Sequence, residues 1–296
     1  MKWKEDLKKF EADNYSGSAE LLEQYIELTL YWLEKGDMQT SKDRGFLMDH
    51  IRKLQETHKT LFVLVHFYNQ VIRVLNEEKE DWNNKLLGFL REYKLVWSSV
   101  STRLANQALS VIDMSHKTIL IHSQSSAVKE VFQQYQGNKK KLKLIQTESR
   151  PIFEGRLQAS AIKRLGYEVT LVPDVGFARH LDNINMILLG ADSIYRDYFV
   201  NKAGSYSICL AGKNSGIPIY VLADSRKFWS SLPPERQEIA YTEQMKPIEE
   251  VWADPPEGIV IENFYFEKAP TAWVDGFITE NEILKPSQIE NMKPIL

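Results

Sequence analysis

From Lys117 onward, short apolar runs of strand length alternate with helical patterns, and this alternation most constrains the fold. The strand-length runs are 118–121, 143–146, 168–172, 186–189, 219–222 and 258–261. Helical patterns lie between them at 128–135, 155–166, 175–181 and 204–213. Strands and helices that alternate at this spacing are typical of parallel βαβ units with right-handed crossovers. Residues 116–296 are therefore predicted to form a Rossmann-like α/β domain with a mostly parallel sheet.

The first 115 residues show helical periodicity instead. One pattern begins at Ser16-Gly17-Ser18, where serine is a good cap, and ends near Gly36. Further helical patterns cover 42–59 and 60–76, and apolar residues spaced by three or four from Leu86 to Ile112 predict one face of a long helix. Residues 1–115 are predicted to form a helical bundle domain, so the fold class is α/β with an amino-terminal helical bundle.

Composition excludes several classes of protein. The net charge of -3 gives no reason to expect direct nucleic-acid binding. The single cysteine indicates a reducing compartment, and no signal peptide or apolar run of membrane-spanning length (~20 residues) is seen, so a cytoplasmic protein without membrane contact is expected. His50, His58 and His66 lack further ligands at metal-binding spacing, so structural roles are favoured, and we expect no metal or cofactor.

Polar residues directly after the apolar strand 186–189 are the main site candidates. Asp192 follows in Gly190-Ala191-Asp192, and Asn201 and Lys202 precede Gly204 and a helix. Ligands of open parallel sheets bind beyond the carboxyl ends of the strands. The pattern predicts a site for a small anionic, hydroxyl-rich molecule, although a buried aspartate cap and a solvated lysine remain the plain alternative.

A serine-rich turn follows the first strand and opens a helix. Its residues Ser123, Ser125 and Ser126 can hold a phosphate with backbone N–H groups and hydroxyls, helped by the helix dipole. Plain helix capping by serine explains the same pattern without a ligand.

Strand-end cations extend the candidate set. Arg150 can bind phosphate through its planar fork, as can Arg156 at the start of the next helix, and either can pair instead with Glu148 or Glu154. Lys227 follows the strand 219–222. Cys209 is predicted to be a small apolar residue of the core. Neither a G-x-G-x-x-G nor a Walker motif occurs, which disfavours a dinucleotide-binding or P-loop protein.

Several motifs together carry a family resemblance. They are Glu148-Ser149-Arg150-Pro151 with Gly155-Arg156, Gly190-Ala191-Asp192-Ser193-Ile194, Asn201-Lys202-Ala203-Gly204-Ser205-Tyr206 and Gly216-Ile217-Pro218-Ile219-Tyr220-Val221. They resemble the family that unites the alpha, beta and delta regulatory subunits of initiation factor 2B with methylthioribose-1-phosphate and ribose-1,5-bisphosphate isomerases. The resemblance implies a helical amino-terminal domain, a Rossmann-like carboxy-terminal domain and a homodimer.

Residue by residue, the resemblance assigns roles in the site. Asp192 would be the acid–base aspartate of the family's isomerases, and Asn201, Lys202 and Lys227 would bind the ligand. Ser18 lies in a segment similar to the family's amino-terminal loop and helix, which implies a ligand contact there.

The sequence also departs from the isomerases at the site. Ser123 stands where they have a cysteine, and an unactivated serine hydroxyl is a far weaker base than a thiolate. Glu154 stands at a ligand-binding position, where the methylthioribose enzymes have a glutamine, and would repel a nearby phosphate. Ser16 replaces an arginine. These changes argue against the standard isomerisation.

Three functions follow. The first is an initiation-factor-2B-like protein of translation initiation that binds a sugar phosphate or nucleotide and is regulatory and non-catalytic. The alternative is a divergent aldose–ketose isomerase in which Asp192 works with another base, His122 or Glu148. The third is a purely structural subunit whose helical face binds partners.

Overall fold

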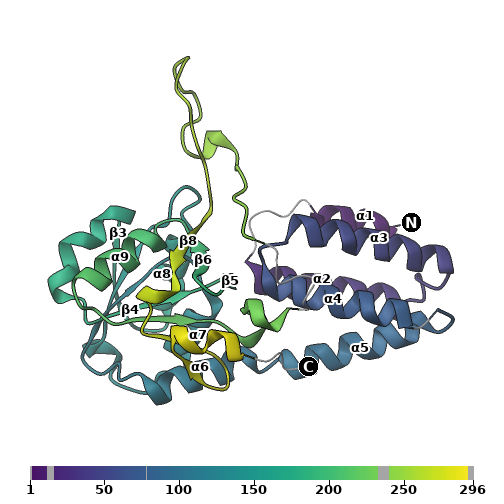
Figure 1. The fold of residues 1–296 in the computed structure, drawn as a ribbon, viewed down its shortest axis with the longest axis horizontal. Coiled ribbons are helices and arrows are strands. Elements are labelled where there is room, and N and C mark those ends of the chain that lie inside the picture. Colours follow the sequence, from purple (N-terminus) through teal and green to yellow (C-terminus); the bar gives the residue numbers. More distant parts are fainter. Residues whose placement is uncertain (1, 12–16, 78, 233–239, 293–296) are drawn as a thin grey trace. The chain divides into compact units, whose positions relative to one another are not determined.

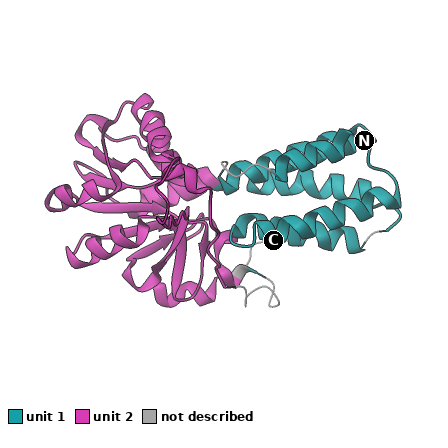
Figure 2. Ribbon diagram, turned by 90° about the horizontal axis from the view of Figure 1, so that it is seen from above, with its two compact units in different colours: residues 1–100, 232–239 teal, residues 101–231, 240–296 magenta. Residues whose placement is uncertain are grey.

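The computed structural model describes residues 2–11, 17–77, 79–232 and 240–292 (Figure 1). The chain divides into two compact units, which Figure 2 shows in different colours. Unit 1 comprises residues 1–100 and 232–239, and unit 2 comprises residues 101–231 and 240–296. The domain division at residue 115 stays a prediction.

Unit 1 is built from helices around one apolar core. The described helices are α1 (Lys2–Glu11), α2 (Ser18–Glu34), α3 (Ser41–Thr57), α4 (Phe62–Glu77) and α5 (Trp82–Trp97). Helix α1 was not predicted, although Trp3, Leu7 and Phe10 bury one face of it at helical spacing. Of the segment Ser16-Gly17-Ser18, at which this helix was predicted to begin, Ser16 lies outside the described residues and Gly17 takes the N-cap position of α2.

The long helix predicted across 86–112 is wrong, because the structure breaks it. Helix α5 ends at Trp97, and α6 (Val100–Val111) begins after a turn at Ser98 and Ser99. The Ser98 hydroxyl donates a hydrogen bond to the carbonyl of Leu95 (2.8 Å). Side-chain bonds of this kind give the backbone an alternative to the helix. The apolar spacing continues through the break, so periodicity alone did not reveal it.

Unit 2 contains a seven-stranded sheet with the order β10-β9-β7-β4-β1-β2-β3. Its strands are β1 (Thr118–Ile121), β2 (Lys143–Thr147), β3 (Glu168–Val172), β4 (Met186–Gly190), β7 (Ile219–Leu222), β9 (Gly276–Ile278) and β10 (Ile283–Leu284). All neighbouring pairs are parallel except β9 with β10. The predicted α/β fold with a mostly parallel sheet is thus confirmed.

Both faces of this sheet are covered. Ile119 and Ile121 of β1 pack in a core with residues of α6, α7 (Ser126–Gln134) and α8 (Glu154–Arg164). Leu120, between them, belongs to the opposite core, with residues of α9 (Ser205–Asn214) and the 3₁₀ segment η2 (Asp174–Asn183). Successive side chains of a strand point to opposite faces, so a strand buried on both sides reads as an unbroken apolar run.

A second, three-stranded antiparallel sheet completes unit 2. It has the order β5-β6-β8 and consists of β5 (Ser193–Ile194), β6 (Tyr198–Lys202) and β8 (Phe266–Pro270). The strand predicted at 258–261 is wrong, since these residues form no strand and Val260 is 87% exposed. A run of apolar residues becomes a strand only where a neighbouring strand can pair with it, and here none does among the described residues.

The chain's single cysteine provides a test of the core of unit 2. Cys209 in α9 is fully buried, as predicted, and burial raises the pKa of its thiol to about 12. Because the thiolate is the reactive form, we expect no reaction with an aromatic disulfide reagent at pH 8 in the folded protein. The thiol should titrate fully in denaturant. Stoichiometric labelling of the folded protein within seconds would contradict the packing of α9.

Candidate functional site

Strands β1 and β4 are adjacent and parallel at the centre of the sheet. The chain leaves β1 towards β2 and β3 on one side and returns to β4 on the other. This reversal of strand order is where open α/β sheets bind ligands, beyond the carboxyl ends of the strands. His122 and Ser123 follow β1, and Ala191 and Asp192 follow β4, so they share this edge. We call the polar region there the strand-end site.

Ser123 sits in a tight turn between β1 and α7. Its backbone is left-handed (φ 65°), and its N–H donates to the Ser149 hydroxyl (2.9 Å). The buried Gln146 amide donates to its carbonyl (3.2 Å). The Ser123 hydroxyl donates to Oε1 of Glu154 (2.6 Å). The turn is thus held by the ends of β2 and α8, and the hydroxyl hydrogen is directed at a carboxylate.

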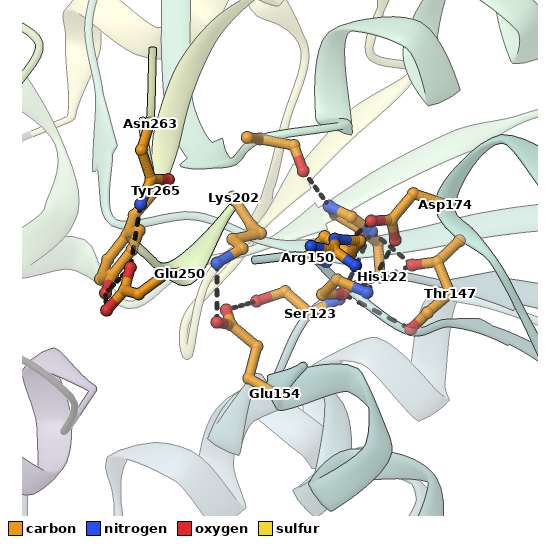
Figure 3. A network of polar contacts seen from close by, with 12 residues as sticks. His122, Ser123, Thr147, Arg150, Glu154, Asp174, Lys202, Glu250, Asn263 and Tyr265 are labelled. Atoms are coloured by element: carbon orange, nitrogen blue, oxygen red, sulfur yellow. Dashed lines mark hydrogen bonds and ion pairs between the residues drawn. The ribbon is translucent and has the colours of Figure 1, made fainter. Parts of the chain in front are cut away.

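An ion pair between Lys202 and Glu154 lies next to this serine (Figure 3). Lys202 ends β6, its side chain is only 1% exposed, and its Nζ donates to Oε2 of Glu154 (2.8 Å). The lysine ammonium also lies 4.8 Å from the centre of the Tyr265 ring. From the sequence, Lys202 was predicted to bind the ligand and Glu154 to repel a nearby phosphate. The structure brings the two charges together, so each neutralises the other.

His122 is tied down through both ring nitrogens. Nε2 lies 2.9 Å from the carbonyl of Ala203, which only accepts, so Nε2 carries the hydrogen and Nδ1 accepts from the Thr147 hydroxyl. Burial lowers the pKa of His122, against the opposing effect of the Asp174 and Glu154 carboxylates. The histidine is therefore neutral near pH 7. It anchors the turn between β6 and α9 and is not placed as a free base.

Asp174, after β3, fixes the turn that follows β2. Its carboxylate accepts hydrogen bonds from the backbone N–H groups of Ser149 and Arg150 (both 2.7 Å). The exposed Arg150 guanidinium lies 5.0 Å from the centre of the Phe153 ring and donates to the Val251 carbonyl (3.4 Å). The arginine is thus at the site's rim, with its charge available to solvent.

Glu148, the other candidate base, is paired as well. It accepts a hydrogen bond from Arg156 of α8 at 2.8 Å. This pair is one of the alternatives that the sequence left open.

Three further predicted residues, Asp192, Asn201 and Lys227, lie after β4, in the last part of β6 and after β7. Lys227 donates to the carbonyl of Ala191 (2.7 Å), the residue that precedes the half-buried Asp192. Asn201 is buried, and its amide donates to the Ser205 hydroxyl (2.8 Å).

The serines at the start of α7 have different environments. Ser125 caps the helix by accepting from the Val128 N–H (3.3 Å), so the capping interpretation holds for this residue. Ser126 begins the helix and is exposed. Ser18 is the buried first residue of α2 in unit 1, and its ligand contact stays a prediction.

One carboxylate near the strand-end site, that of Glu267, was not predicted from the sequence. Oε1 of Glu267 on β8 accepts from the backbone N–H groups of Gly204 (2.8 Å) and Tyr206 (2.7 Å) at the start of α9. Gly204 has φ 108°, and a Cβ there would lie 2.9 Å from the His122 ring. Free N–H groups at a helix start attract anions. At α9 the protein's own carboxylate fills that position, a pairing across the second sheet that sequence spacing could not reveal.

The described residues offer neither a metal site nor a membrane-spanning helix. Within them, no group of three or more His, Cys, Asp or Glu side chains could hold a metal ion. No helix in the described ranges is long and apolar enough to cross a membrane. His50, His58 and His66 instead contact Glu11, Tyr68 and Tyr93 in unit 1.

These features define a Rossmann-like protein with an additional helical unit and a polar site at the strand ends. The model of the Initiation factor 2 subunit family matches residues 18–286, and the chain belongs to this family. The resemblance seen in the sequence motifs is thereby confirmed.

Relatives of two kinds are similar to this chain. An eIF-2B subunit 2-like protein of Pyrococcus horikoshii is 29% identical over 285 residues, which cover 95% of this chain and 96% of the relative. A ribose 1,5-bisphosphate isomerase of Archaeoglobus fulgidus is 26% identical over 243 residues, which cover 79% and 74%. The crystal structure of the Pyrococcus horikoshii translation initiation factor eIF-2B has a TM-score of 0.79 at 24% identity, covers 97% of this chain and 98% of that one, and shows the shared fold.

The neutral, buried state of His122 predicts a pH dependence of stability. The unfolded chain binds a proton at His122 near pH 6.5, and the folded chain binds it only at lower pH. The free energy of unfolding should therefore fall as the pH drops below about 6.5, by at most about 1.4 kcal/mol per pH unit from this residue. Urea unfolding at pH 7.5 and 5.5 measures it.

Variants isolate the contribution of His122. His122→Gln can still donate to Ala203 but does not titrate, so its stability should depend less on pH. His116→Asn is the matched control, because His116 is exposed and its left-handed backbone (φ 59°) suits asparagine. An unchanged pH dependence in His122→Gln would refute the assignment.

Proposed function

We propose that this chain is a regulatory, non-catalytic member of its family that binds a small phosphorylated metabolite, a phosphosugar or a nucleotide, at the strand-end site. The observation that carries the proposal is the hydrogen-bonded chain Ser123–Glu154–Lys202, whose serine stands where the resemblance places the family's thiol. The Ser123 hydroxyl has an intrinsic pKa far above that of a thiol (about 8.5), so it is not a base near pH 7.

The groups expected to hold a ligand are retained. Lys227 donates to the carbonyl of Ala191, which precedes Asp192, and Asn201 and Lys202 end β6. We assign the phosphate to the start of α7, where Ser126 is exposed and the helix dipole favours an anion. Arg150 at the rim supplies a further positive charge.

The wider setting belongs to the same proposal. The eIF-2B subunit 2-like relative covers nearly the whole chain, which supports a role in translation initiation. We propose a homodimer in the cytoplasm, without direct contact to nucleic acid or membranes.

A second candidate is a divergent aldose–ketose isomerase. The bond from the Ser123 hydroxyl to Glu154 favours it, because it places a carboxylate within reach of the position of the thiol. Glu154 would then move protons together with Asp192, a role for which His122 and Glu148 are less suited because of their partners. The ribose 1,5-bisphosphate isomerase relative supports the reaction class.

Ligand binding is tested by thermal shift with a panel of phosphosugars and nucleoside monophosphates. At least one should raise the melting temperature, and Lys202→Ala should weaken its binding roughly tenfold or more, since a charge-assisted hydrogen bond contributes about 1.5–3 kcal/mol. Lys213→Ala, on the exposed side of α9, should bind as the unchanged protein does. If no compound of the panel shifts the melting temperature, the proposed function is wrong.

Turnover separates the two candidates. The regulatory proposal predicts no interconversion of phosphopentoses by the unchanged protein, measured by NMR over hours. Isomerisation that Asp192→Asn abolishes would establish the second candidate and overturn the first.

A further inference from the structure

Two anion-attracting positions on the β6 side of the strand-end site are already occupied by carboxylates of the chain itself. One is the Lys202 ammonium, which is paired with Glu154 at 2.8 Å. The other is the start of α9, where Glu267 accepts from the N–H groups of Gly204 and Tyr206. Neither position therefore offers net positive charge to a ligand.

The Lys202–Glu154 pair is also held by its surroundings. The lysine side chain is 1% exposed and lies against the Tyr265 ring, and the second oxygen of Glu154 accepts from Ser123. A phosphate bound to Lys202 would have to approach the Glu154 carboxylate, whose two oxygens accept hydrogen bonds from Ser123 and Lys202. Like charges at such distances disfavour binding strongly, whereas a sugar hydroxyl can donate to Glu154 and accept from Lys202.

Building on the proposed function, we infer that Glu154 determines the class of ligand: the Lys202–Glu154 pair receives sugar hydroxyls, and the site takes a monophosphorylated sugar in preference to a bisphosphorylated one. The single phosphate is bound away from the pair. Glu154 therefore acts as a specificity determinant, in contrast to a glutamine, which would leave the lysine charge free for a second phosphate.

The test compares two probes, ribose 5-phosphate and ribose 1,5-bisphosphate, by isothermal titration calorimetry on the full chain. The unchanged protein should bind the bisphosphate no more tightly than the monophosphate. In Glu154→Gln the ratio of the two dissociation constants should move by roughly tenfold or more towards the bisphosphate, because a charge-assisted bond to Lys202 becomes available. Glu168→Gln, which removes an exposed carboxylate from β3, should leave the ratio unchanged.

Glu154→Gln leaves Lys202 buried without its counter-ion and can reduce folding. The double variant Glu154→Gln/Lys202→Met removes both charges and serves as the second test. Because the pair contributes no net charge, the double variant should keep the preference for the monophosphate. A loss of bisphosphate affinity that exceeds the loss of monophosphate affinity by roughly tenfold or more in the double variant would show that Lys202 does bind a phosphate, and would overturn the inference.

The outcomes separate this inference from the function on which it rests. The inference is overturned, and the metabolite site left intact, if the unchanged protein binds the bisphosphate at least tenfold more tightly than the monophosphate and Glu154→Gln does not change the ratio of the two dissociation constants. The proposed function is overturned, and the inference with it, if neither the unchanged protein nor either variant binds any compound. The compounds tested are the two probes and the phosphosugar and nucleotide panel.

Discussion

The ion pair between Lys202 and Glu154 is the interaction on which the strand-end site depends. It joins the end of β6 to the start of α8, and the Ser123 hydroxyl extends it to the turn after β1. Removing a lysine ammonium from water costs several kcal/mol, so a lysine that is 1% exposed requires a partner of opposite charge. The pair therefore fixes three segments distant in sequence and sets the charge of the site at the same time.

The surrounding groups show the same principle of internal neutralisation. Glu267 satisfies the start of α9, Asp174 satisfies two backbone N–H groups after β2, and His122 is neutral with both nitrogens bonded. Polar groups in a region this buried must find partners within the protein. The result is a region in which most of these polar and charged groups have partners within the protein.

The sequence predicted the fold well where burial leaves a clear pattern. The runs at 118–121 and 186–189 became β1 and β4 because central strands of a doubly covered sheet are apolar on both faces. It failed where the pattern has no local cause: the break at Ser98 lies inside continuous helical periodicity, and the apolar run 258–261 found no strand to pair with. Likewise, Asp192 and Ser123 were identified as candidates, but the adjacency of β1 and β4 that brings their turns to one edge was not.

Residue types and their order determined the class of fold and the family, because these depend on local pattern and motif. Tertiary structure decided which charges are paired. Glu154 and Lys202 are separated by 48 positions, and Gly204 and Glu267 by 63, so no spacing rule connects them. Electrostatic energy depends on distance in space and on exclusion of water, and both are set only when the strands and helices pack together.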